Sequence, residues 1–169
     1  MKIVSRAFAP RMAVAMVAIA LGIGIMDCGG GGSHVNDVIN TEILKATLDG
    51  TSETPQVTSS GSGNVDLVGN RALNTIAFDL RTQDLDGITG AFIQVGEEGS
   101  TGPVIFTLSN DSSSAAADTL GSGDLTPDPD AGINTIDDAI DAMVDGRTYV
   151  NVTTQAHPDG EIRGQIVQR

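Results

Sequence analysis

The stretch that decides the fold lies near the carboxyl end and reads Gly146-Arg-Thr-Tyr-Val-Asn-Val-Thr-Thr-Gln-Ala-His-Pro-Asp-Gly-Glu-Ile-Arg-Gly-Gln165. Residues 149–153 are rich in β-branched and aromatic side chains, and residues 161–166 alternate polar or small side chains with apolar ones. Both patterns are typical of strands. Between them, Pro158-Asp159-Gly160 suits a tight turn, because proline presets φ and glycine adopts the left-handed conformation. The stretch therefore predicts one β-hairpin.

The rest of the chain predicts further short strands separated by turns rich in Gly and Asp. The clearest alternation of apolar and polar residues is at 73–80, whereas the small residues at 110–118 predict a surface loop. The expected strands are residues 43–48, 64–68, 73–80, 88–95 and 104–108, with a short edge strand at 120–125. Seven or eight such strands predict an all-β fold, a two-layer antiparallel β-sandwich with Greek-key connections of the immunoglobulin or superoxide dismutase type.

One short helix is predicted at residues 136–145, just before the closing hairpin. Asn134 or Thr135 can cap its first turn, where Asp137 and Asp138 also suit the helix dipole. Gly146 follows as the expected C-terminal residue. Because its apolar residues fall on one face, we expect the helix to cover one end or edge of the sandwich.

The amino terminus predicts export. Three basic residues precede an uncharged apolar run at residues 12–26, which is shorter than the roughly 20 residues of a membrane-spanning helix and typical of a signal peptide. We assign residues 1–27 to that peptide and residues 28–37 to a Gly-rich tether. Cys28, directly after the run, resembles the acylation site of a bacterial lipoprotein. Asp27 stands where lipoproteins have Gly, Ala or Ser, so the alternative is an ordinary signal peptide that leaves a free thiol.

The composition limits the partners. The chain has 9 basic and 22 acidic residues, a net charge of −13. Without residues 1–27, six basic and 21 acidic residues would remain, a net charge of −15. Such a charge repels nucleic acid, so none is expected as a partner. A single cysteine allows no disulfide within the domain at 38–169, so a hydrophobic core must stabilise it.

The closing hairpin is similar to the end of the CHRD (chordin-type) domain, which has Tyr, Asn and a Pro-x-Gly-Glu-Ile-Arg-Gly-Gln segment in the same register. Residues 91–102 resemble a second motif of that family, and Glu53 with Pro55 resembles its opening motif. The resemblance covers residues 43–167 and implies a β-sandwich. The positions that it singles out are Gln94, Gly96, Gly99, Gly102, Tyr149, Asn151, Thr153, Glu161 and Arg163.

The chain departs from the family at three positions that commonly hold histidine, where it has Phe92, Gln94 and Thr153. Three histidines on neighbouring strands would suit a transition metal, whereas these side chains are poor ligands or none. We therefore expect no metal and no cofactor, and no enzymatic activity. The competing hypothesis is a metal-dependent redox enzyme of the superoxide dismutase type.

Two other groups of residues are candidates. His157, Asp159 and Glu161 alternate and could form a small site, although a solvated turn with Glu161 paired to Arg163 is the simpler interpretation. Loops with Asp84 and Asp86, and with several aspartates at 124–130, could bind calcium, but aspartate is also a common turn former. A calcium-stabilised adhesion module is thus a further alternative.

The sequence as a whole favours an exported, lipid-anchored and non-enzymatic module that binds something or has a structural role. We expect it in the bacterial cell envelope, at the outer membrane or cell surface, with a periplasmic or secreted location as the alternative. Its expected partners are the membrane, through the lipid on Cys28, and a protein or glycan that the sequence does not specify. The growth-factor antagonism of animal chordin is not carried over to this chain.

Overall fold

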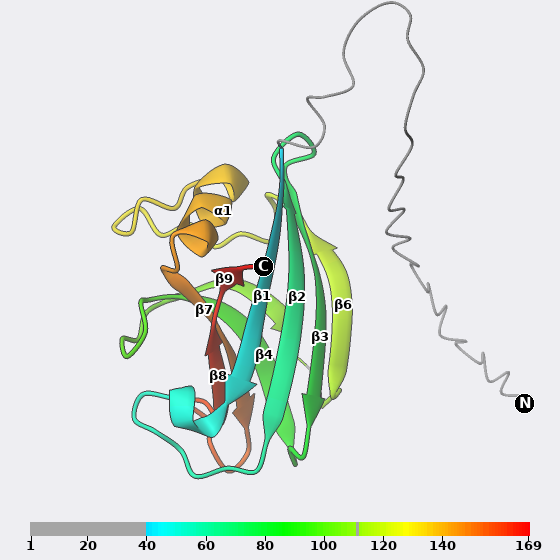
Figure 1. The fold of residues 1–169 in the computed structure, drawn as a ribbon, viewed down its shortest axis with the longest axis vertical. Helices are drawn as coiled ribbons and strands as arrows, with labels where there is room; N and C mark the ends of the chain where they lie inside the picture. The colour runs from blue at the N-terminus through cyan, green and yellow to red at the C-terminus, as the bar shows by residue number, and fades with distance from the viewer. Residues whose placement is uncertain (1–39, 111) are drawn as a thin grey trace, which may run out of the picture. The chain divides into compact units, whose positions relative to one another are not determined.

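The computed structural model describes residues 40–110 and 112–169, which form a curled antiparallel sheet with one α-helix (Figure 1). The expected signal peptide, tether and Cys28 lie outside the described residues. The elements are β1 (Thr41–Asp49), the 3-10 helix η1 (Gly50–Ser52), β2 (Ser62–Asn70), β3 (Thr75–Gln83), β4 (Ile88–Val95), β5 (Val104–Ser109), β6 (Ala115–Leu120), α1 (Ile136–Val144), β7 (Thr148–Thr154), β8 (Ile162–Gln165) and β9 (Val167–Gln168).

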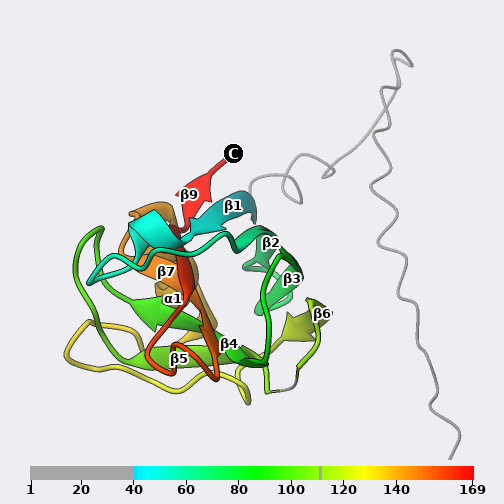
Figure 2. The same ribbon diagram turned by 90° about the horizontal axis from the view of Figure 1, so that it is seen from below.

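The strands pair in the order β5-β4-β7-β8-β1-β2-β3-β6, with β9 beside β1. Strands β1, β2 and β3 form a meander, whereas β3 pairs with β6 and β4 pairs with β7 across longer connections. The sheet curls so that β4, β5 and β7 face β1, β2 and β3, as the view from below shows (Figure 2). The expected all-β antiparallel fold is therefore confirmed, and its two layers are parts of one sheet.

The apolar core lies inside the curl. Strands β1, β2 and β3 send alternate side chains into it, as the pattern at Ile76, Phe78 and Leu80 predicted. Full burial of such a side chain is worth about 1.5–3 kcal/mol, so the core supplies the main stabilising term. Its fully buried members include Leu44, Leu48, Leu67, Ile76, Ile93, Ile105, Phe106, Ile133, Ile136, Ile140, Val150 and Val152.

Helix α1 matches the prediction and contacts β1, β3, β7 and β9. It begins with a capping box, in which the Asp138 backbone N–H donates to Thr135 Oγ1 at 3.2 Å and the Thr135 N–H donates to Asp138 Oδ2 at 2.9 Å. The backbone N–H of Asn134 and the hydroxyl of Thr135 lower the pKa of the Asp138 carboxyl. Gly146, with φ of +68°, ends the helix and sends the chain into β7.

One strand was placed wrongly by the sequence. The predicted edge strand at residues 120–125 is instead β6, at Ala115–Leu120, inside the region predicted as a loop. Its small side chains give almost no hydrophobic pattern, and pairing with β3 from Arg81 to Ile76 defines it. After Leu120, the Asp124 carboxylate accepts the Gly121 N–H at 2.8 Å and closes a turn. Strand β9 was not predicted.

Candidate functional site

Strand β7 is buried on both faces. Val150 and Val152 point into the apolar core, whereas Tyr149, Asn151 and Thr153 lie on the outer face of the sheet. Loops cover that outer face and bury or half-bury polar side chains from three strands and from the segment after η1. We call this set the polar layer; its members are Glu53, Gln94, Tyr149, Asn151, Arg163 and Gln165.

Arg163 lies at the centre of the polar layer. Its side chain is only 2% exposed, and the guanidinium carbon stands 3.5 Å from the centroid of the Tyr149 ring. Such a desolvated cation–π contact is worth about 2 kcal/mol. The Arg163 Nη2 group also donates to the backbone oxygen of Glu97 at 3.0 Å. Burial raises the pKa of the Tyr149 hydroxyl, which remains a neutral hydrogen-bonding group.

The polar layer holds the loop that joins β4 to β5. Gln94 donates to Gly102 O at 3.2 Å, and the Gly102 N–H donates to the Tyr149 hydroxyl at 3.3 Å. Gln165 donates to Gly96 O at 2.8 Å. Gly96 and Gly99 adopt φ of +152° and +79°. These two glycines of the family motif at residues 91–102 are therefore explained by backbone conformations that favour glycine. The side chains of the motif therefore act mainly on the loop backbone.

Asn151 joins this loop to the closing hairpin. Its amide nitrogen donates to Gln94 Oε1 and to the Asp159 backbone oxygen, both at 3.0 Å. These two acceptors fix the orientation of the amide, because flipping it would turn an oxygen toward two oxygens. The opposite atom, Asn151 Oδ1, is buried and has no hydrogen-bond partner among the described residues.

Glu53 approaches the same point from the segment after η1. Its side chain is 7% exposed, and its Oε1 atom has no hydrogen-bond partner within the described part of the chain. The Nη1 group of Arg163 is also buried and has no hydrogen-bond partner among the described residues. A Cβ atom on Gly160 would stand 2.5 Å from both Glu53 Oε1 and Asn151 Oδ1, so the hairpin turn closes tightly over these two oxygens.

The charge of Glu53 is poorly compensated. Burial raises the pKa of its carboxyl, and the Thr54 backbone N–H, the Arg163 guanidinium and His157 offset this only in part. A buried carboxylate without sufficient hydrogen bonds costs free energy in the folded state. Glu53 is therefore a group that the fold tolerates rather than one that stabilises it.

The far end of β7 is tied by hydroxyl groups. Thr153 lies 2.8 Å from the Thr89 hydroxyl, while Glu161 accepts hydrogen bonds from Thr154 at 2.6 Å and Ser59 at 2.7 Å. Burial works against ionisation of Glu161, but these two hydroxyls lower the pKa of its carboxyl overall. The predicted pairing of Glu161 with Arg163 is wrong, because each side chain has different partners.

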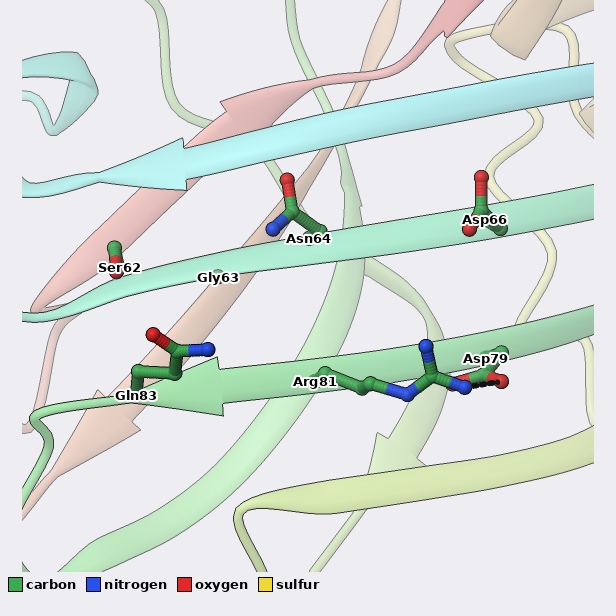
Figure 3. Close-up of a pocket in the computed structure, with 7 residues that line it drawn as sticks. All are labelled: Ser62, Gly63, Asn64, Asp66, Asp79, Arg81 and Gln83. Atoms are coloured by element: carbon green, nitrogen blue, oxygen red, sulfur yellow. Dashed lines mark hydrogen bonds and ion pairs between the residues drawn. The ribbon is translucent and has the colours of Figure 1, made fainter.

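The surface of the described residues includes two hollows of similar size. One, of about 280 Å³, is an open polar trough on the outer face of β2 and β3, where Arg81 pairs with Asp79 at 2.6 Å (Figure 3). The other, of about 300 Å³, lies between the segment after η1 and the β7–β8 turn, and we call it the hairpin pocket. It is lined by Glu53, Thr54, Pro55, Val57, Ala156, His157, Pro158, Asp159 and Gly160.

The other candidate groups of the sequence do not come together. Residues 40–110 and 112–169 contain no cluster of three or more His, Cys, Asp or Glu side chains that could hold a metal ion. Of the alternating trio, His157 and Asp159 line the hairpin pocket, whereas Glu161 binds Ser59 and Thr154. The Asp128 carboxylate accepts the Ala131 N–H at 3.3 Å, as a turn former does.

The family of the chain follows from comparison with known proteins. The model of the CHRD domain family matches residues 44–166, from β1 to the residue after β8. The chain belongs to the CHRD family. No curated protein and no solved structure matches it. No helix of the described CHRD domain is long and apolar enough to cross a membrane.

Most of the family-motif positions of the CHRD domain thus meet in one place, whereas Thr153 and Glu161 lie at the far end of β7. Gln94, Gly96, Gly102, Tyr149, Asn151 and Arg163 belong to the polar layer or to the loop that it holds. Sequence reasoning did not select Glu53 and Gln165 as site residues, although both stand in family motifs. The available signal was only their place in those motifs, because neither a glutamate nor a glutamine is ordinarily buried.

Proposed function

We propose that this CHRD-domain protein is exported, anchored through an acyl group on Cys28, and acts as a non-enzymatic binding or structural module of the bacterial cell envelope. The basic residues before residues 12–26, the apolar run itself and Cys28 directly after it support export and acylation. Two or more acyl chains hold a protein stably at a membrane, at about 0.8 kcal/mol per buried methylene.

The observation that carries the binding or structural role is how the motif side chains are used. Gln94, Tyr149, Arg163 and Gln165 each make a hydrogen bond to the backbone of the loop between β4 and β5, and Gln165 also binds the backbone oxygens of Gly146 and Thr148. A scaffold that fixes loops above a rigid sheet is the usual way in which β-domains present a binding surface. The same contacts leave these side chains engaged with the fold rather than free for a reaction.

Labelling with a radioactive fatty acid tests the anchor. We expect the full-length protein to carry the label and to sediment with membranes, and Cys28→Ala to lose both properties. Ser33→Ala is the matched control in the tether and should keep the label. Equal labelling of wild type and Cys28→Ala, or a cytoplasmic location of both, would refute the proposal.

Metal analysis tests the non-enzymatic part. We expect the protein purified under native conditions to carry no stoichiometric copper or zinc, because Phe92, Gln94 and Thr153 replace the family's histidines. We also expect millimolar calcium and a chelator to leave its melting temperature unchanged, since binding to the native state would raise it. Stoichiometric copper or zinc would favour the redox enzyme, and a calcium-dependent melting temperature would favour the adhesion module.

A further inference from the structure

The hairpin pocket brings together two segments that lie far apart in the sequence. Glu53, Thr54, Pro55 and Val57 line it from the first segment, and residues 156–160 line it from the second. Both segments lie at the end of the sheet where η1 and the β7–β8 turn meet (Figure 1). A volume of about 300 Å³ is at the small end of the range for sites of small organic groups.

The chemistry of the pocket centres on Glu53. This residue lines the pocket and is only 7% exposed, and its buried Oε1 atom has no hydrogen-bond partner among the described residues. Asn151 Oδ1, a second unpartnered acceptor, lies behind it next to Gly160. Asn151 does not line the pocket, so Glu53 is the acceptor that a ligand can reach, and a carboxylate short of donors favours a group with N–H donors and a positive charge.

The neighbouring cation does not meet this need. Arg163 offsets only part of the rise that burial causes in the pKa of the Glu53 carboxyl, and no ion pair within 4.0 Å joins the two described side chains. The guanidinium is held on the Tyr149 ring and on Glu97 O. The positive charge of Arg163 repels a second cation. A cationic ligand must therefore approach Glu53 from the hairpin pocket and not from the polar layer.

The other lining residues restrict the shape of the ligand. Pro55, Val57, Ala156 and Pro158 present apolar surface that suits methylene groups, and exposed Asp159 stands on the wall opposite Glu53. His157 is the other titratable side chain that lines the pocket. The strongly acidic domain raises the local concentration of cations around it.

We propose that the hairpin pocket binds a primary ammonium group on an aliphatic stem, with Glu53 as its main acceptor and Asp159 as a second one. This is the chemistry of a lysine side chain or of a free diamine. The inference rests on the proposed binding role and names the ligand class of that role. The stem lies against the two prolines, and the ammonium group brings a positive charge and N–H donors to the Glu53 carboxylate.

The test is a titration of the full-length protein, in non-ionic detergent, with n-butylammonium chloride, followed by the backbone amide signals of Thr54 and Gly160. We expect saturable shifts at these two residues and none with n-butanol, which has the same stem without the charge. Nα-acetyl-lysine amide and cadaverine, titrated separately, distinguish a lysine side chain from a free diamine. Absence of saturable shifts with all three amines, or equal shifts with n-butanol, would overturn the proposal.

Variants locate the site. Glu53→Gln should weaken butylammonium binding by about tenfold or more, because one charge-assisted hydrogen bond is worth about 1.5–3 kcal/mol. Asp159→Asn should weaken butylammonium binding by a smaller factor. This second variant keeps the test decisive if Glu53→Gln does not fold. The controls Glu98→Gln and Asp130→Asn change exposed carboxylates elsewhere and should leave binding unchanged. Unchanged binding in both pocket variants contradicts the proposal, whereas fatty-acid labelling of Cys28 reports separately on the anchor.

Discussion

The two faces of β7 differ in what they bury. The inner face places Val150 and Val152 in a core of aliphatic and aromatic side chains. On the outer face, loops bury Tyr149 and Asn151 together with Arg163, which lies on the neighbouring strand β8. Several buried polar atoms there have no hydrogen-bond partner among the described residues. The inner face therefore stabilises the fold, whereas the outer face positions loops and keeps groups that cost free energy.

The largest effect is expected inside the curl. Phe106→Ala should lower the free energy of unfolding by about 3–5 kcal/mol, because the ring is fully buried and its loss leaves a cavity. The matched change Phe92→Ala, on the partly exposed outer face of β4, should cost about 1 kcal/mol. Urea denaturation of both variants measures the difference. Equal losses would remove the distinction between the two faces.

Next in size is the tight approach of the hairpin turn to the polar layer. Gly160→Ala should cost about 3 kcal/mol, since the added Cβ meets Glu53 Oε1 and Asn151 Oδ1 at 2.5 Å while φ is +144°. Gly99→Ala is the control, because φ is +79° there but nothing lies within 4 Å of the Cβ; it should cost about 1–2 kcal/mol. Thermal or urea unfolding gives both values, and similar losses would show that the turn does not press on Glu53.

A smaller loss is expected from the cation of the polar layer. Arg163→Lys should cost about 2 kcal/mol, because a lysine cannot stack on the Tyr149 ring and reach Glu97 O with one planar group. Arg81→Lys, on an exposed side chain that pairs with Asp79, should change stability by less than about 0.5 kcal/mol. Equal effects in urea denaturation would mean that the burial of Arg163 contributes nothing specific.

The same contrast explains what the sequence could predict. The alternation at Ile76, Phe78 and Leu80, and the cap at Thr135, depend on neighbours along the chain, so the core-facing pattern and the helix were predictable. Strand β6 was not, because its small residues become a strand only through pairing with β3.

The polar layer was only partly predictable, for a different reason. Alternation assigns Tyr149, Asn151 and Arg163 to a face opposite the core, and that face is ordinarily solvated. Glu53 buries this face from a segment far away in the sequence, together with the loop after β4. The family motifs named most of the residues, but only the fold shows that their side chains hold loop backbone.

The smallest expected effects on stability come from the ionisation of Glu53 and Glu161, and they depend on pH. Because burial raises the pKa of Glu53 above its ordinary 4.5, the folded state binds the proton more tightly than the unfolded state. Wild-type stability should therefore fall, relative to Glu53→Gln, as the pH rises from about 4.5 through the raised pKa. Glu161 has the opposite shift, so the stability that it contributes above 4.5 should be lost as the pH falls through its lowered pKa. Melting temperatures of wild type, Glu53→Gln and Glu161→Gln across this range test both signs, and parallel profiles would contradict them.

The most direct test of the comparison is the free energy of unfolding of Glu53→Gln at neutral pH, measured by urea denaturation beside wild type. If the polar layer keeps Glu53 at a cost to the fold, the variant will be as stable as wild type or more stable, because glutamine fills the same space without the buried charge. A loss of about 2 kcal/mol or more would mean that Arg163 requires the carboxylate as its counter-charge. That result would contradict the account, because the outer face would then stabilise the fold as the inner face does.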